Sequence, residues 1–199
     1  MRVVVPYAAS DRDARIGLYP AVRAALEADG VAAEYVDVSG SPTAYHELLA
    51  GLWREGQAFT VIEHDVVVRP GAIAELDRCP ERWCCAVYRS AVGPLIGGLG
   101  CTRFSGQLLQ EHPAVFRTID HLPPDGTPRH YWGRLDTRLK IVLMQSEGVT
   151  PHAHYGLVDY HRSPDYAMQL TFNCDKCGAV IPPQLYTEMP PPYPCARCS

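Results

Sequence analysis

Residues 59–68 read FTVIEHDVVV, in which two apolar segments flank a pair of acids. The first four residues are apolar or β-branched and predict a strand that is buried on both faces. Glu63 and Asp65 follow at its carboxyl end, which is where open α/β sheets collect their ligands. Ionised groups between buried segments need a compensating partner. The pair can therefore share a hard divalent cation, Mg²⁺ or Mn²⁺, and the alternative is an acidic pair in a surface turn.

The segments on either side of this stretch alternate between strand and helix patterns. The predicted strands are residues 2–6, 33–38, 59–62, 84–88 and 149–160. The predicted helices are residues 15–29, 43–53, 72–77, 104–110 and 134–146. Gly30 is expected to end the first helix, and Thr43 is expected to cap the second. This order predicts an α/β domain with a mostly parallel sheet flanked by helices.

Bulk composition excludes several classes of protein. The chain has 199 residues, of which 47% are hydrophobic and 20% are charged, as in ordinary globular domains. The net charge of −4 argues against non-specific binding to nucleic acid. No apolar run reaches the length of a membrane span, and the first residues do not resemble a secretory signal. We therefore expect a cytoplasmic protein with no membrane partner.

The end of the chain holds two Cys-x-x-Cys pairs separated by seventeen residues. The four cysteines are Cys174, Cys177, Cys195 and Cys198. Two such turns complete a tetrahedral thiolate site for zinc, whereas the alternative is two disulfides or four unrelated thiols. Four thiolates leave no position for a catalytic water, so the zinc is expected to be structural. We expect a zinc ribbon over residues 169–199, after a larger domain over residues 1–168.

The remaining cysteines and the histidines suggest further, weaker features. Cys79, Cys84, Cys85 and Cys101 are expected to be buried thiols in a reducing compartment. His152 and His154 would share one face of a strand, with His161 a few residues on. These three histidines can form a second metal site, or one can line a cleft while the others are hydrogen-bonded or exposed. The glycine-rich residues 93–100 lack the phosphate-loop lysine and are expected to form a tight loop beside a substrate.

Five segments occur in an order that is typical of one enzyme family. They are Val3–Tyr7, Tyr35–Ser41, Val61–Ala72, Gly133–Asp136 and His161. With these segments, residues 2–161 resemble nucleotide-sugar-dependent glycosyltransferases of the GT-A type. The third segment looks like the Asp-x-Asp strand of that family, although Glu63 stands at the first acidic position. The resemblance implies a GT-A-like fold.

The resemblance also implies roles for individual residues. The residues expected at the nucleotide-sugar donor are Pro6, Tyr7, Asp37, Glu63 and Asp65. Glu63 and Asp65 would hold Mn²⁺ or Mg²⁺ on the donor diphosphate, with His161 as a third ligand. Such an ion offsets the charge on the departing nucleoside diphosphate. Asp136 would be the general base that deprotonates an acceptor hydroxyl.

These expectations together describe a metal-dependent glycosyltransferase whose acceptor the sequence does not identify. Because zinc ribbons often dock partners, the acceptor can be a macromolecule held by the ribbon, and simple capping of the domain is the alternative. Two other functions stay open. One is a nucleotidyltransferase, which also holds a metal with acids at strand ends. The other is a non-catalytic recognition module built from a degenerate transferase domain and the ribbon.

Overall fold

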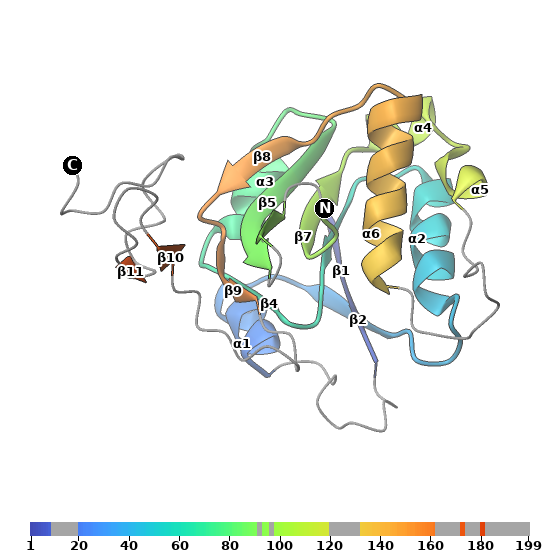
Figure 1. Ribbon diagram of the computed structural model, residues 1–199. Helices are drawn as coiled ribbons and strands as arrows, with labels where there is room; N and C mark the ends of the chain where they lie inside the picture. Colours follow the sequence, from blue (N-terminus) through green and yellow to red (C-terminus); the bar gives the residue numbers. More distant parts are fainter. Residues whose placement is uncertain are drawn as a thin grey trace.

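The computed structural model describes residues 1–8, 20–90, 93–95, 98–119, 132–161, 172–173 and 180–181. Within this part of the chain, a seven-stranded sheet forms the centre of the fold (Figure 1). Its strands are β1 (Arg2–Tyr7), β2 (Ala33–Asp37), β3 (Phe59–Ile62), β5 (Trp83–Ser90), β6 (Gly93–Leu95), β7 (Cys101–Phe104) and β8 (His152–Tyr155). They lie in the order β2-β1-β3-β7-β5-β6, with β8 paired to β5.

The strand directions confirm the predicted α/β class with a mostly parallel sheet. β1 is parallel to both β2 and β3, and β5 is parallel to β8. β7 is antiparallel to both β3 and β5, so β1, β2, β3, β5 and β8 all run in one direction. Only β6 and β7 run the other way among the described strands of this sheet. The strand β7 was not among those predicted.

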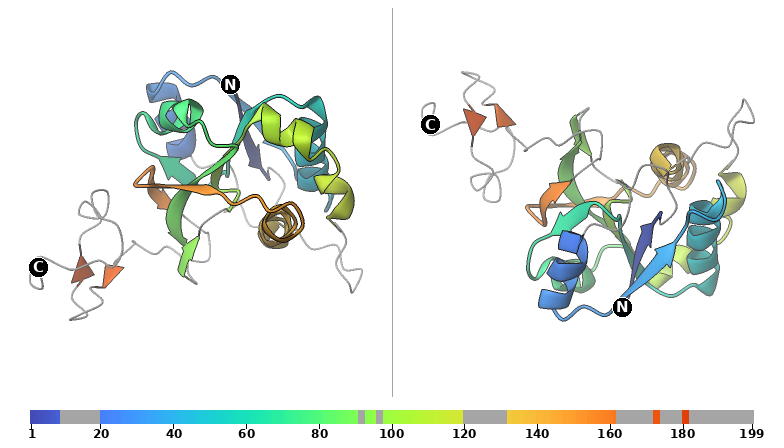
Figure 2. Two further views of the ribbon diagram at one scale, coloured as in Figure 1. Left: turned by 90° about the horizontal axis from the view of Figure 1, so that it is seen from above. Right: turned by 90° about the horizontal axis from the view of Figure 1, so that it is seen from below.

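Helices cover both faces of the sheet, as the views in Figure 2 show. They are α1 (Pro20–Ala28), α2 (Ala44–Glu55), α3 (Ala72–Arg78), α4 (Gly106–Glu111), α5 (Val115–Thr118) and α6 (Trp132–Ile141), which continues as the π-helical turn η1 (Val142–Ser146). Val4 and Val61 belong to a core shared with α2, α4, α5 and α6. Val3 and Ile62 face the other way, into a core shared with α1 and α3. Alternation along each strand therefore builds two cores, one on each face.

The helix ends test two predictions from the sequence. Gly30 follows α1 with φ of +67°, and its N–H donates to the Glu27 carbonyl at 3.0 Å, so the predicted stop is confirmed. The start predicted for this helix, before Pro20, lies outside the described residues. Thr43 occupies the N-cap position of α2 but makes no side-chain cap. Its hydroxyl donates to a Glu47 carboxylate oxygen at 2.6 Å instead, because Thr43 has helical φ and ψ rather than the extended backbone of a capping residue.

Two predicted elements divide differently in the structure. Residues 66–68 leave the large sheet and form β4 (Val66–Val68), which pairs antiparallel with β9 (Val158–His161). The long strand predicted over residues 149–160 breaks at Gly156, whose φ of +69° turns the chain between β8 and β9. The helix predicted from Phe104 begins at Gly106, because Phe104 ends β7 and Ser105 caps α4 by accepting from the Leu108 N–H at 3.2 Å.

Two short strands lie in the C-terminal tail. β10 (Phe172–Asn173) and β11 (Val180–Ile181) pair antiparallel, and Cys174 and Cys177 lie between them in the sequence. The four predicted zinc ligands lie outside the described residues, and so does the predicted domain boundary at residue 168.

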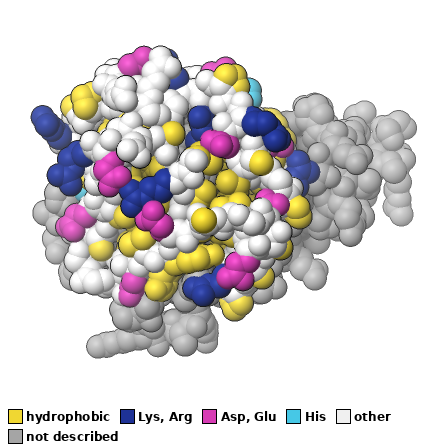
Figure 3. All heavy atoms as spheres, turned by 180° about the vertical axis from the view of Figure 1, so that it is seen from behind, with side chains coloured by type: hydrophobic (Ala, Val, Ile, Leu, Met, Phe, Trp, Pro, Cys, Tyr) yellow, Lys and Arg dark blue, Asp and Glu magenta, His cyan; other side chains and the backbone are white. Residues whose placement is uncertain are grey.

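Two further features of the described residues are the distribution of charge over one face and the length of the helices. On the face drawn in Figure 3, the coloured side chains of Lys and Arg are interspersed with those of Asp and Glu, without a continuous basic stripe among them. Throughout the described residues, no helix is both long enough and apolar enough to span a bilayer.

Candidate functional site

The carboxyl ends of three neighbouring strands meet at one edge of the sheet. Because β1, β2 and β3 are parallel, Tyr7, Asp37 and Ile62 end their strands on the same side. Tyr7 pairs directly with Asp37, and its carbonyl accepts from the Val38 N–H at 2.8 Å. Glu63 follows Ile62 immediately in the chain. The structure thus brings the residues expected at the nucleotide to a single edge.

Three carboxylates, Glu63, Asp65 and Asp136, form what we call the acid cluster. Asp65 is only 6% exposed, and Glu63 and Asp136 are half-buried. The end of the glycine-rich segment holds two of them in place. The Asp136 Oδ1 accepts from the Leu99 N–H at 2.9 Å, and the Glu63 N–H donates to the Gly100 carbonyl at 2.9 Å. These two bonds place Asp136, which belongs to α6, close to Glu63 at the carboxyl end of β3.

Burial raises the pKa values of all three carboxyl groups, and repulsion from the other two acids adds to the rise at Glu63. Burial comes first in raising the pKa of Glu63 well above its ordinary range, followed by the negative charges of Asp136 and Asp65. A hydrogen bond from the Tyr45 hydroxyl, at 3.4 Å, opposes that rise. Burial raises the pKa of Asp65 to about 7. It raises the pKa of Asp136 to about 6, against a backbone hydrogen bond and the positive charge of Lys140.

The acid cluster has the donor type of a site for a hard divalent cation, but its oxygens do not gather around one point: among the described residues, the one group of three or more ligand atoms within 4.8 Å of one another is Cys79, His152 and His154. The donors of the acid cluster are all carboxylate oxygens, which Mg²⁺ and Mn²⁺ prefer over nitrogen and sulfur. A cation there would offset the desolvation that raises all three pKa values and the repulsion that acts on Glu63, so the carboxyl groups would ionise readily at neutral pH. Asp136, with a pKa of about 6, is already mostly ionised at neutral pH and can accept a proton.

The structure also places two further predicted site residues, His161 and Asp37. His161 pairs through its backbone with Val66, the residue that follows Asp65, so β9 brings it next to the acidic segment. Asp37 is exposed at the end of β2, and its Oδ1 accepts from the Ser39 N–H at 2.9 Å and from the Ser39 hydroxyl at 2.6 Å. These bonds fix the turn after β2 in an Asx geometry.

A second group of side chains was only partly anticipated. Cys79, Cys84, Cys85 and Cys101 are all buried and form no disulfide, as predicted. Cys79, however, lies beside His152 and His154, and the ligand atoms of the three residues all lie within 4.8 Å of one another. The alternation of the two histidines on a strand was visible in the sequence. The cysteine was not, because it belongs to a distant segment.

Comparisons with known proteins return structural likeness alone. No protein-family model matches the chain, and no curated protein sequence does. The crystal structure of A197 from STIV matches with a TM-score of 0.49 and 14% identity, over 83% of this chain and 91% of that chain. A glycosyltransferase involved in the glycosylation of the major capsid of PBCV-1 matches with a TM-score of 0.41 and 10% identity, over 78% and 82% of the two chains. Likeness at these TM-scores assigns no function, so what the site can do follows from its own geometry.

Proposed function

We propose that this protein is a metal-dependent glycosyltransferase that takes its sugar from a nucleoside-diphosphate donor. The observation that carries the proposal is the acid cluster, Glu63, Asp65 and Asp136, at the carboxyl end of β3. Buried carboxylates with raised pKa values are costly for the fold unless a ligand compensates them. The neighbouring strand ends, Tyr7 and Asp37, offer a surface for that ligand at the same edge.

In this proposal, Glu63 and Asp65 hold Mn²⁺ or Mg²⁺, with His161 as a third ligand. The bound ion would supply electrostatic stabilisation to the departing nucleoside diphosphate. The chain itself contributes a nearly dry setting, since Asp65 is 6% exposed and follows a fully buried strand. Low local dielectric strengthens each interaction made there.

The nucleotide end of the donor would lie across the ends of β1 and β2. Asp37 is exposed and its carboxylate is already oriented by Ser39, so it can accept hydrogen bonds from a base or ribose. Pro6 and Tyr7 end the adjacent strand and would form the wall beside it. The bonds that Asp37 makes to Ser39 reduce the ordering needed when the ligand binds.

Asp136 is the proposed general base toward the acceptor hydroxyl. Its pKa of about 6 lies near neutral pH, where a base is both ionised and able to take up a proton. The Leu99 N–H, at 2.9 Å, fixes Oδ1 and leaves Oδ2 as the oxygen for proton transfer. The backbone of residues 98–100 therefore positions the base.

We also propose that residues 1–168 form the transferase domain and that residues 169–199 form a structural zinc ribbon. The zinc ion of the ribbon would be bound by Cys174, Cys177, Cys195 and Cys198. Metal binding would stabilise a segment too small to form a core of its own. We further propose a cytoplasmic protein whose macromolecular acceptor docks on the ribbon.

The test is metal-dependent consumption of nucleotide sugars by the zinc-loaded chain. Each donor of a panel is incubated with Mn²⁺, and release of the nucleoside diphosphate is followed by chromatography. Turnover of one donor should fall at least about 100-fold in Asp65→Asn and in Asp136→Asn. It should be unchanged in Asp77→Asn, an exposed acid on α3. Release of pyrophosphate from nucleoside triphosphates would instead identify a nucleotidyltransferase, and inertness toward both panels would favour a recognition module.

A further inference from the structure

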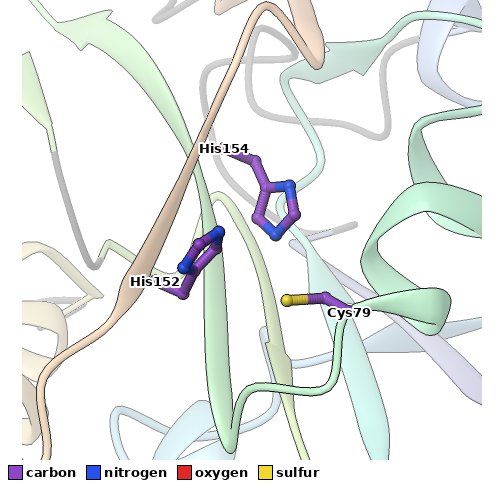
Figure 4. Close-up of side chains that lie close together, drawn as sticks. All are labelled: Cys79, His152 and His154. Carbon is purple, nitrogen blue, oxygen red and sulfur yellow. The ribbon is translucent and has the colours of Figure 1, made fainter.

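Cys79, His152 and His154 form a compact group on the α3 side of the sheet. Cys79 follows the last residue of α3 and precedes β5, whereas the two histidines lie on the edge strand β8. Figure 4 shows the thiol and the two imidazoles turned toward one another, and the ligand atoms all lie within 4.8 Å of each other. The group is separate from the acid cluster, because it lies along the pairing of β8 with the first half of β5, whereas Glu63 and Asp65 follow the carboxyl end of β3.

The strand register explains why the two imidazoles converge on Cys79. β8 is parallel to β5, with His152 opposite Cys84 and His154 opposite Ala86. Residues opposite each other in a ladder share a face of the sheet, and alternate residues of one strand share it too. Cys84 and Ala86 belong to the core on the α3 side, and so does Cys79. The imidazole rings consequently lie 4.8 Å apart, edge to face.

His154 has the hydrogen bonding of a metal ligand. Its Nδ1 lies 3.1 Å from the Glu75 carboxylate, which favours a proton on Nδ1 and an unprotonated Nε2. Among the described residues, that buried Nε2 has no hydrogen-bond partner. A histidine ligand commonly holds its second nitrogen on a carboxylate in this way, which orients the ring and raises its basicity. A buried nitrogen without a partner is costly, and a metal ion would compensate it.

We propose that Cys79, His152 and His154 bind a zinc-class ion, with Glu75 positioning His154. One thiolate and two imidazoles suit Zn²⁺, whereas Mg²⁺ and Mn²⁺ prefer oxygen ligands. The fourth position is open to solvent on the side of His152, the exposed member of the group. The ion ties the end of α3 to the edge strand β8. The inference stands independently of the proposed function, since none of these residues belongs to the acid cluster.

The test is the zinc content of the full-length chain, measured after zinc saturation and gel filtration. The wild-type chain should retain one zinc ion per chain more than the His152→Ala/His154→Ala variant, whatever the tail binds. Glu75→Gln should keep that ion but bind it about 10–100-fold more weakly against a competing chelator. His112→Ala is the matched control, because His112 also pairs with a glutamate, Glu147, at 2.7 Å. Its zinc content should equal that of the wild type.

A second set of measurements distinguishes the loss of a zinc ligand from the unfolding of a variant. His152 is exposed, so His152→Ala alone should keep the wild-type circular dichroism spectrum while binding the ion at least about tenfold more weakly. In wild-type protein loaded with Co²⁺, the visible spectrum should contain a component that disappears in Cys79→Ala. Equal zinc content in the wild type and in the folded histidine variants would overturn the proposal, and so would a cobalt spectrum unaffected by Cys79→Ala.

Discussion

Replacing Asp65 by asparagine should remove much of the pH dependence of folding stability. Burial raises the pKa of Asp65 from its ordinary value of 3.8 to about 7. Between these values the folded chain binds a proton that the unfolded chain releases, so stability falls as pH rises through this window. The full difference corresponds to about 4 kcal/mol, of which about 3 kcal/mol falls between about pH 5 and about pH 8. An asparagine side chain cannot ionise, so the Asp65→Asn variant should not show this loss.

The assay is urea unfolding of the zinc-loaded protein at about pH 5 and about pH 8, followed by circular dichroism without added divalent ions. Wild-type protein should lose about 3 kcal/mol more than Asp65→Asn across this interval. The exposed Asp77→Asn serves as the control and should follow the wild type. Added Mg²⁺ should restore wild-type stability at about pH 8, by about 2.7 kcal/mol at a hundredfold excess over its Kd, and should not affect Asp65→Asn. Parallel pH profiles for wild type and Asp65→Asn would refute the reasoning.

Three further predictions concern the core and its backbone. Thr102→Val should lower the free energy of unfolding in urea by about 1–3 kcal/mol, because the buried Trp83 indole N–H donates to the Thr102 hydroxyl at 3.0 Å. Thr102→Ser keeps a hydroxyl and should retain most of the stability. Gly71→Ala should lower the free energy of thermal unfolding by about 1–2 kcal/mol, because the φ of Gly71 is +81°. Gly40 has open space around it and no positive φ, so an equal effect of Gly40→Ala would contradict this prediction. Cys101, whose pKa burial raises to about 12, should resist alkylation at about pH 8 in native protein and react in urea, as mass spectrometry would show.

The sequence predicted the parallel part of the sheet better than the antiparallel part. β1 and β3 were recognised because runs such as Val3–Val5 are β-branched and fully buried. The inserted strand β7 was missed because Thr102 and Arg103 make its four residues look polar. Both side chains find partners far away in the sequence: the Thr102 hydroxyl donates to the Cys84 carbonyl at 3.0 Å, and the Arg103 Nη1 donates to the Glu81 carbonyl at 3.0 Å. Partners supplied by distant strands are invisible in local patterns.

The two candidate sites differ in how far they could be predicted. Glu63 and Asp65 were identified because acids that follow a buried strand are a local signal. Placing Asp136 beside Glu63 needed the resemblance, since the contact depends on how α6 packs against residues 98–100. No local signal joins Cys79 to His152, because only the parallel pairing of β5 with β8 brings those segments together.

The most direct test of the metal-dependent donor site is calorimetric titration of a panel of nucleoside diphosphates into the zinc-loaded chain, with and without Mn²⁺. We predict that one nucleoside diphosphate binds only when Mn²⁺ is present, that Asp65→Asn abolishes this binding, and that Asp77→Asn leaves it intact. Binding that does not depend on Mn²⁺ or survives in Asp65→Asn would contradict the assignment of the acid cluster. The absence of binding by every member of the panel would contradict the glycosyltransferase proposal as a whole.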